Sequence, residues 1–169
     1  MALIRTILVP MDHSGGSIAA LEYASSLAEL CSAKVDVLHV HDHDDFKVGS
    51  SVPLAPEALR EAEQHMDEAI ARATNRLGDR LRRTTKHGDP LKTIVEAAGE
   101  GDFDLIVMGT SGRIGRLYMI VGSVAEGVIR NAPCPVLTVR VHEGEESLAE
   151  RLRGGASLAD LVRARQGVR

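Results

Sequence analysis

Glycines and a serine in the second half of the chain have a spacing that suits a bound phosphate. Residues 109–123 read GTSGRIGRLYMIVGS and place Gly109, Gly112, Gly122 and Ser123 in the pattern Gly-x2-Gly-x9-Gly-(Ser/Thr). Glycine lets backbone N–H groups approach an anion closely, and a helix that starts at Ser123 adds a hydroxyl, free N–H groups and a favourable dipole. The spacing therefore predicts a loop that holds the phosphates of a nucleotide.

Two other phosphate-binding patterns do not occur in the sequence. It contains no Gly-x4-Gly-Lys-(Ser/Thr), and residues 109–115 do not read Gly-x-Gly-x-x-Gly. Residues 14–18 faintly resemble the pyrophosphatase loop of ATP-using synthetases, but Ile18 and Ala19 stand where that loop needs an acidic residue and a serine. Adenylyl-transfer chemistry is therefore not supported.

The segments around the glycine loop alternate between strand and helix patterns. Each short apolar run is followed by a stretch with apolar residues at helical spacing. The expected strands are 3–10, 34–41, 81–87, 104–109 and 135–141, and the expected helices are 18–31, 57–77, 90–98 and 123–131, with a polar connection at 42–56. This alternation predicts an α/β fold, a doubly wound, five-stranded parallel sheet with helices on both faces.

Ligands of such sheets bind beyond the carboxyl ends of the strands, where the winding reverses. Strands 3–10 and 104–109 are expected to flank that point. The loops that leave them are 10–16, which contains Asp12, and 109–122, which contains the glycines. We therefore expect Asp12 and the glycine loop to converge.

The chain strongly resembles the ATP-binding members of the universal stress protein family. The resemblance covers residues 4–140 and is carried by the opening ILVPMD, the segment VDVLHV, the glycine pattern and the ending GSVAEGVIRNAPCPVLTVR. It implies strand order 3-2-1-4-5 in an adenine-nucleotide α-hydrolase-like fold. It also implies that ATP is bound, with Mg2+ or Mn2+ bridging the phosphates, and no protein ligand for that ion is assigned.

The resemblance assigns a nucleotide-binding role to twelve positions and a catalytic role to none. The first four frame the base and the ribose, the next five line the ribose and phosphates, and the last three close on the phosphate tail. In chain order they are Pro10, Met11, Asp12, Val40, Met108, Gly109, Ser111, Gly112, Arg113, Gly122, Ser123 and Val124.

Three of these residues have a second interpretation that needs no ligand. Ser123-x-x-Glu126 also fits a capping box, which starts a helix by itself. Asp12 also suits the cap of the first helix, for which Ser14 and Ser17 are other candidates. Arg113 suits either a phosphate contact or a solvated surface charge.

The leading functional hypothesis is a nucleotide-dependent regulator of the stress response with little or no turnover. The alternative is a slow ATPase or phosphotransferase that uses the same loop, since the sequence places no general base. A third class is an interaction module without nucleotide, against which the intact glycines argue. The resemblance also implies a homodimer through the final strand, residues 136–140.

Histidines elsewhere suggest two weaker hypotheses. His39, His41 and His43, with the neighbouring aspartates, offer imidazole and carboxylate ligands for zinc or nickel, but their spacing matches no closed zinc site and a polar loop after a strand is the favoured interpretation. His13 lies between Asp12 and Ser14, but consecutive residues on a turn do not usually converge as a catalytic triad.

Composition sets the remaining expectations. The formal net charge is -4, with no Trp, two Tyr and two Phe, which disfavours nucleic-acid binding. No apolar run is long enough for a membrane span, so a cytoplasmic protein is expected. Cys31 and Cys134 are expected to be reduced thiols, with Cys134 as a small buried residue rather than a reactive one.

Two regions are expected along the chain. Residues 1–141 form the nucleotide-binding domain, and residues 142–169 form a helical or partly disordered extension. In the extension, Ser147-x-x-Glu150 and Ser157-x-x-Asp160 resemble two helix starts with small apolar stripes. These stripes suggest packing on a partner, on a second copy or on the domain itself.

Overall fold

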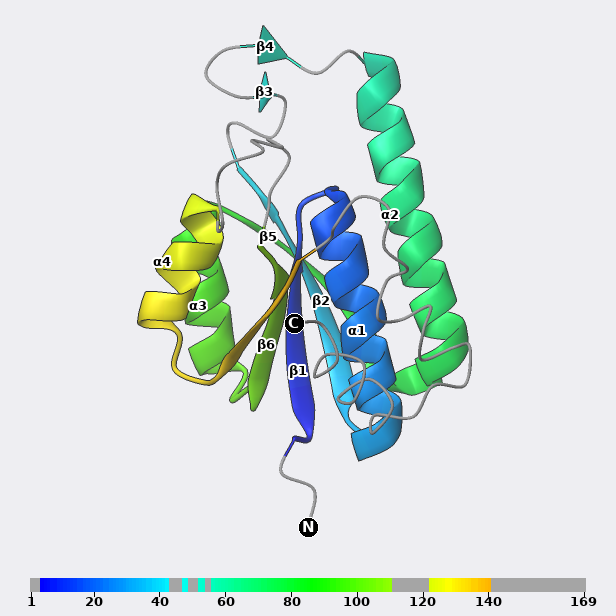
Figure 1. Cartoon of the computed structure of the whole chain (residues 1–169), viewed down its shortest axis with the longest axis vertical. Helices are drawn as coiled ribbons and strands as arrows, with labels where there is room; N and C mark the ends of the chain where they lie inside the picture. The colour runs from blue at the N-terminus through cyan, green and yellow to red at the C-terminus, as the bar shows by residue number, and fades with distance from the viewer. Residues whose placement is uncertain (1–3, 43–46, 49–51, 54–55, 111–121, 141–169) are drawn as a thin grey trace, which may run out of the picture.

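The structure is a computed structural model that describes residues 4–42, 47–48, 52–53, 56–110 and 122–140 (Figure 1). Its elements follow the chain as β1 (Thr6–Met11), α1 (Gly15–Cys31), β2 (Lys34–His41), β3 (Lys47–Val48), β4 (Val52–Pro53), α2 (Pro56–Leu77), η1 (Gly78–Arg80), β5 (Leu81–His87), α3 (Pro90–Glu100), β6 (Leu105–Gly109), α4 (Ser123–Asn131) and β7 (Val136–Val139). The proposed extension, 142–169, lies outside the described residues.

Five strands form one parallel sheet in the order β5-β2-β1-β6-β7. Numbered along the chain without the short pair β3 and β4, this is 3-2-1-4-5, so the predicted doubly wound sheet is confirmed. Helices α1 and α2 cover one face and α3 and α4 the other (Figure 1). The winding reverses between β1 and β6, as expected from the sequence.

Strand β2 shows why the sheet is buried on both faces. Val35 and Val37 belong to the core under α1 and α2, whereas Leu38 and Val40 belong to the core under α3 and α4. Successive side chains of a strand point to opposite faces, so a strand covered on both faces needs a nearly continuous apolar run.

No helix in the described part of the chain is long and apolar enough to cross a membrane.

The structure shortens or refines several predicted elements. Strand β1 begins at Thr6, so Ile4 and Arg5 precede it, and residue 3 of the predicted strand lies outside the described part. Strand β7 ends at Val139, and residue 141 lies outside the described part. Within the connection 42–56, β3 and β4 pair antiparallel, which the sequence analysis did not anticipate. Residues of high strand propensity, Val48 and Val52, face each other in that pair.

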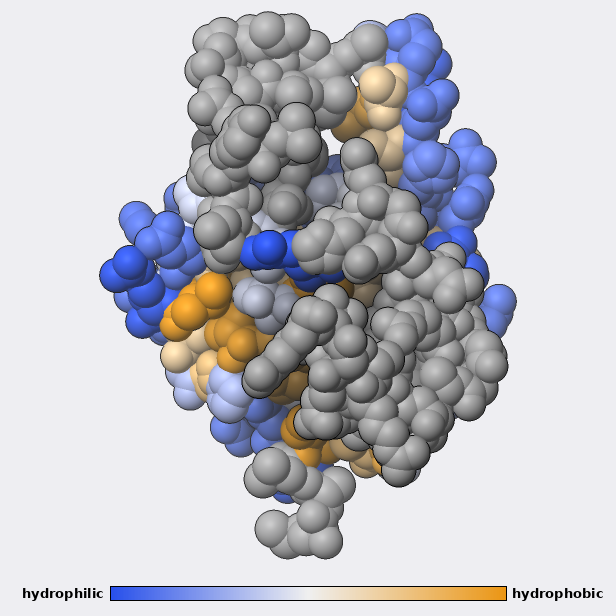
Figure 2. Space-filling view, in the orientation of Figure 1, coloured by the Kyte–Doolittle hydropathy of each residue, from blue (hydrophilic) through white to orange (hydrophobic). Residues whose placement is uncertain are grey.

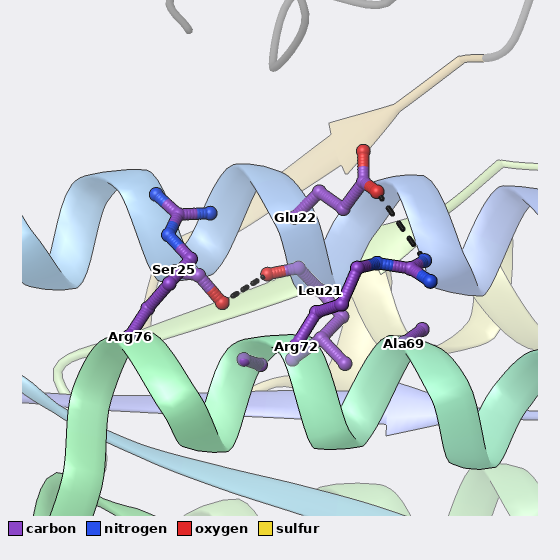
Figure 3. A pocket seen from close by; sticks show the side chains of 7 residues that line it. Leu21, Glu22, Ser25, Ala69, Arg72 and Arg76 are labelled. Atoms are coloured by element: carbon purple, nitrogen blue, oxygen red, sulfur yellow. Dashed lines mark hydrogen bonds and ion pairs between the residues drawn. The ribbon is translucent and has the colours of Figure 1, made fainter.

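The seam between α1 and α2 combines small apolar residues with ion pairs at its rim. Figure 3 shows Arg72 reaching Glu22, at 3.7 Å, above Leu21 and Ala69. One turn further, Arg76 pairs with Glu29 at 2.5 Å. The hollow between them is only about 50 Å³, so it is a packing seam rather than a binding site.

Side chains cap two of the helices. The Ser14 hydroxyl accepts the Ser17 N–H at 3.1 Å at the start of α1. At α3, Asp89 accepts the Lys92 N–H at 2.9 Å, and Pro90 is the first helical residue. Ser14 is thus the residue, among the candidates for the first cap, that fills it, and each of the two caps satisfies a backbone donor that the helix itself cannot.

Asp104 ties the amino-terminal ends of β1 and β6 together. Its Oδ2 accepts the N–H groups of Arg5 and Thr6 at 2.8 and 3.0 Å, and the Thr6 hydroxyl at 3.1 Å. The Arg5 N–H is the largest cause that lowers the pKa of this carboxyl below its ordinary value of 3.8. Because the folded chain prefers the ionised form, Asp104 stabilises the fold above that pH, and this contribution is lost as the pH falls.

We expect Asp104→Asn to lower the urea midpoint of unfolding at pH 7, because a neutral amide accepts these three bonds less well. The gap between wild type and variant should narrow as the pH falls below 3.8, since the wild-type carboxyl then becomes protonated. Asp67→Asn is the control, because Asp67 makes only an exposed pair with Arg83 at 2.9 Å. A gap that stays constant with pH would contradict this account.

Candidate functional site

The carboxyl ends of β1 and β6 lie side by side at the point where the winding reverses. The two strands pair in parallel, with Ile7 opposite Leu105. A Cβ atom built on Gly109, the last residue of β6, would lie 2.7 Å from the carbonyl carbon of Gly16 and 2.9 Å from its oxygen. Only a glycine lets the exit of β6 approach the first turn of α1 this closely. The start of the predicted loop after β6 therefore meets the end of the predicted loop after β1.

The turn after β1 is fixed by a compact set of hydrogen bonds. Asp12 Oδ1 accepts the N–H and the hydroxyl of Ser14 at 3.2 and 2.5 Å, and the Asp12 N–H donates to Ser17 Oγ at 3.4 Å. Ser14, not Asp12, caps α1, so the alternative interpretation of Asp12 as the helix cap is wrong. Asp12 instead holds the capping serine, and no described residue donates to its Oδ2.

Helix α4 begins without a side-chain cap. Its N-cap is Gly122, which has no side chain, and Ser123 is already the first helical residue. The capping-box interpretation of Ser123 is therefore wrong, because the N-cap position of such a box is taken by glycine. The Gly122 N–H donates to the Thr110 carbonyl at 2.6 Å, and the Glu126 N–H is bonded back to Gly122 at 2.9 Å. By helix geometry, the N–H groups of residues 123–125 have no acceptor within the helix.

Two buried polar atoms at this edge lack a partner among the described residues. They are Thr110 Oγ1, directly after β6, and His39 Nε2, near the end of β2. Buried polar atoms nearly always have a hydrogen-bond partner. Two such atoms without one therefore make this edge of the sheet unusual. Sequence reasoning assigned no role to Thr110. Its position between Gly109 and the rest of the glycine pattern was the available signal.

The structure brings nine of the twelve predicted site residues to this edge. Met11 packs in the core under α1 and α2, whereas Val40 and Met108 pack in the core on the other face. Because these side chains are engaged in the cores, their backbone groups are what they present at the edge. Ser111, Gly112 and Arg113 lie outside the described residues.

Comparison with known proteins identifies the family. The sequence model of the universal stress protein family matches residues 3–140. The chain belongs to the universal stress protein family. A universal stress protein of Methanocaldococcus jannaschii is 37% identical over 142 residues, which cover 82% of this chain and 83% of that protein.

Solved universal stress proteins share the fold. UspA of Lactobacillus plantarum aligns with a TM-score of 0.63 and 28% identity, over 81% of this chain and 98% of that one. A universal stress protein of Archaeoglobus fulgidus in complex with dAMP aligns with a TM-score of 0.52 and 25% identity, over 82% of this chain and 98% of that one. The family resemblance stated from the sequence is thereby confirmed.

A row of imidazoles crosses the same edge of this universal stress protein. Ring centroids are 4.6 Å apart for His13 and His39, 4.5 Å for His39 and His41, and 5.1 Å for His41 and His87. Even so, no group of three or more metal-ligating side chains within the described ranges could hold a metal ion. His43 lies outside those ranges.

The turn at His13 brings its two neighbours together but directs the His13 ring elsewhere. Asp12 and Ser14 do converge, with 2.5 Å between the carboxylate and the hydroxyl, although they are two residues apart. The ring of His13 lies against His39 instead. His13 has a left-handed backbone with φ of 64°, which turns the chain between its two neighbours.

Charged residues elsewhere are engaged with one another. A groove of about 270 Å³ lies over β2 and β5 beside α3, with Leu38 and Phe103 among its lining residues. Its buried carboxylate, Asp36, is bonded by the Arg82 guanidinium and by the Thr84 hydroxyl. These groups satisfy each other, so the groove shows no need for a ligand.

The surroundings of Cys134 agree with the expected unreactive thiol, although its side chain is partly rather than fully buried. Both cysteines are free and partly buried. Burial, and secondarily the Asp104 charge, raises the pKa of the Cys134 thiol. A raised pKa leaves less of the nucleophilic thiolate at neutral pH.

We expect Gly109→Ala to lower the free energy of unfolding by about 1–3 kcal/mol, the usual cost of forcing one extra carbon into a packed site. The atoms in its way belong to the Gly16 backbone, which cannot rotate aside. Gly15→Ala is the matched control, because a Cβ there meets nothing within 4 Å. Chemical denaturation measures both, and equal effects of the two substitutions would contradict the close approach.

Proposed function

We propose that this chain binds an adenine nucleotide at the carboxyl edge of β1 and β6, and that it acts as a nucleotide-dependent regulator in the stress response. The observation that carries the proposal is the start of α4. Helices α1 and α3 are capped by their own side chains, whereas α4 presents a glycine and uncapped N–H groups. A helix start of this kind, at the end of a glycine loop, suits a phosphate.

The opposite wall of the site suits the nucleoside. Asp12 is held by Ser14 through Oδ1, which leaves Oδ2 for a ribose hydroxyl or for the base. The backbone of Pro10, Met11 and Val40 lies at the ends of β1 and β2, where the resemblance places the base. Since the exit of β6 meets the first turn of α1 at Gly109 and Gly16, a single nucleotide would span both walls.

A relative supports the class of ligand. The Archaeoglobus fulgidus universal stress protein was solved with dAMP, an adenine nucleotide with one phosphate. The preference for ATP rests on the resemblance of the glycine pattern to that of the ATP-binding members of the family. The resemblance implies that Mg2+ or Mn2+ bridges the phosphates of the bound ATP, and no protein ligand for the ion is assigned.

The simplest test is calorimetry with Mg-ATP on the full chain and on Ser123→Ala. We expect the wild type to bind and the variant to bind about ten- to a hundredfold more weakly, the usual effect of losing a hydrogen bond to a charged group. Ser26→Ala is the control, because Ser26 lies within α1 and bonds the Glu22 carbonyl at 3.1 Å. Absence of binding by the wild type would refute the proposal.

Turnover separates the regulator from the alternative enzyme. A regulator should release phosphate from ATP slowly or not at all, because a site that only binds places no base beside the attacking water. Steady phosphate release that disappears in Asp12→Ala would instead favour the slow ATPase or phosphotransferase. Titrations with AMP, ADP and ATP would rank the nucleotides by phosphate number.

We also propose that the chain forms a homodimer through β7. This strand is at the edge of the sheet, and its residues are only partly buried. Figure 2 shows apolar surface in the region where Figure 1 draws β7, whereas the outer faces of α2 and α4 are hydrophilic. An unpaired apolar edge strand is a template for pairing with a second copy.

The hydrogen bonds of β7 indicate how to test this. The carbonyls of Pro135 and Val139 accept N–H groups of Ile106 and Thr110, both at 3.0 Å, so alternate residues face β6 and the Thr138 N–H faces outward. Thr138→Pro should therefore convert a dimer into a monomer without breaking the sheet. Thr138→Val keeps that N–H and is the control. Light scattering measures the mass, and a monomeric wild type would refute the dimer.

A further inference from the structure

His39 is a polar side chain that is almost completely buried. It lies in β2 with only 4% of its surface exposed, opposite Met11 in the register of the two strands. Its Nδ1 is 2.8 Å from the Met11 carbonyl oxygen. A carbonyl only accepts hydrogen bonds, so Nδ1 must carry the proton and donate it. The other ring nitrogen, Nε2, has no partner among the described residues.

The hydrogen bond from His39 is made to the peptide group that joins Met11 to Asp12. The Met11 carbonyl and the Asp12 N–H belong to one planar peptide unit. His39 holds the oxygen side of this unit at 2.8 Å, and Ser17 Oγ accepts its N–H side at 3.4 Å. With both sides held, the unit cannot rotate, and the direction in which Asp12 leaves the strand is fixed.

Neighbouring rings hold the imidazole in this orientation. His13, from the turn itself, lies 4.6 Å away by ring centroids at an interplanar angle of 56°. His41, from the same strand as His39, lies 4.5 Å away at 90°. The ring is therefore packed between the turn and the strand, and its donor stays aimed at the end of β1. A metal centre is not supported, since no group of three ligating side chains in the described part could hold an ion.

We propose that His39 is a positioning residue for the nucleotide site: through its Nδ1 proton it fixes the Met11–Asp12 peptide and thereby the Asp12 carboxylate. The inference rests on the proposed function for its effect on affinity, but not for its effect on the turn. It assigns a role to a buried histidine that touches neither the glycine loop nor the start of α4 in the described contacts.

Three substitutions at one position test the proposal. His39→Asn places an amide N–H close to the position of Nδ1, His39→Gln places it one carbon further out, near Nε2, and His39→Leu has no donor. We expect the Asn variant to keep the wild-type affinity for Mg-ATP. The Gln and Leu variants should bind about tenfold more weakly, the ratio that corresponds to one lost buried hydrogen bond.

Hydrogen exchange without nucleotide gives an independent measurement. The Asp12 and Ser14 amides should exchange faster in the Gln and Leu variants than in wild type and Asn, while the Val37 amide, within β2, reports the general stability of the sheet. If the Leu variant does not fold, the comparison of Asn with Gln is sufficient. The proposal would be overturned if all variants had equal exchange rates and equal affinity for Mg-ATP. It would also be overturned if the Asn variant lost as much affinity as the Gln variant. If the amides exchange as expected in all variants but the wild type binds no nucleotide, the proposed function is refuted and the role of His39 in the turn is not.

Discussion

The contact between Gly109 and Gly16 is the constraint on which the rest of the site depends. It brings the exit of β6 against the first turn of α1, at a distance that no side chain would permit. Because β1 and β6 are neighbours in a parallel sheet, their carboxyl ends already share one edge. The glycine contact removes the remaining gap, so that the loop after β6 starts where the loop after β1 ends.

Each wall of the site is then held by contacts of its own. Asp12 is fixed by two serines and, as we infer, by His39. The far wall is fixed by Thr110, whose N–H bonds to β7 and whose carbonyl accepts the Gly122 N–H. None of these contacts uses a ligand. The frame of the site is therefore part of the fold, and only the groups that face outward from it are left for chemistry.

The sequence allowed the strand order and the sheet edge where the loops meet to be predicted, and it offered Ser14 as one of the candidates for the cap of α1. These follow from local patterns: alternation of elements, and capping residues directly before helical periodicity. It could not decide whether Ser123 caps α4 or follows its cap, because that depends on one residue of register at a helix start. It also could not show that His39 bonds Met11, since the two residues are 28 apart and meet only through strand pairing.

The bare start of α4 has a consequence for the last part of the domain. A helix of nine residues gains little from its own sequence, and a missing cap removes part of that gain. The same start is bonded to Thr110, and Thr110 is bonded to the edge strand β7. Any anion that fills the first turn of α4 would therefore strengthen the helix and the strand edge together. In such an arrangement, the binding of an anion at the site and the rigidity of the exposed strand β7 would be thermodynamically coupled.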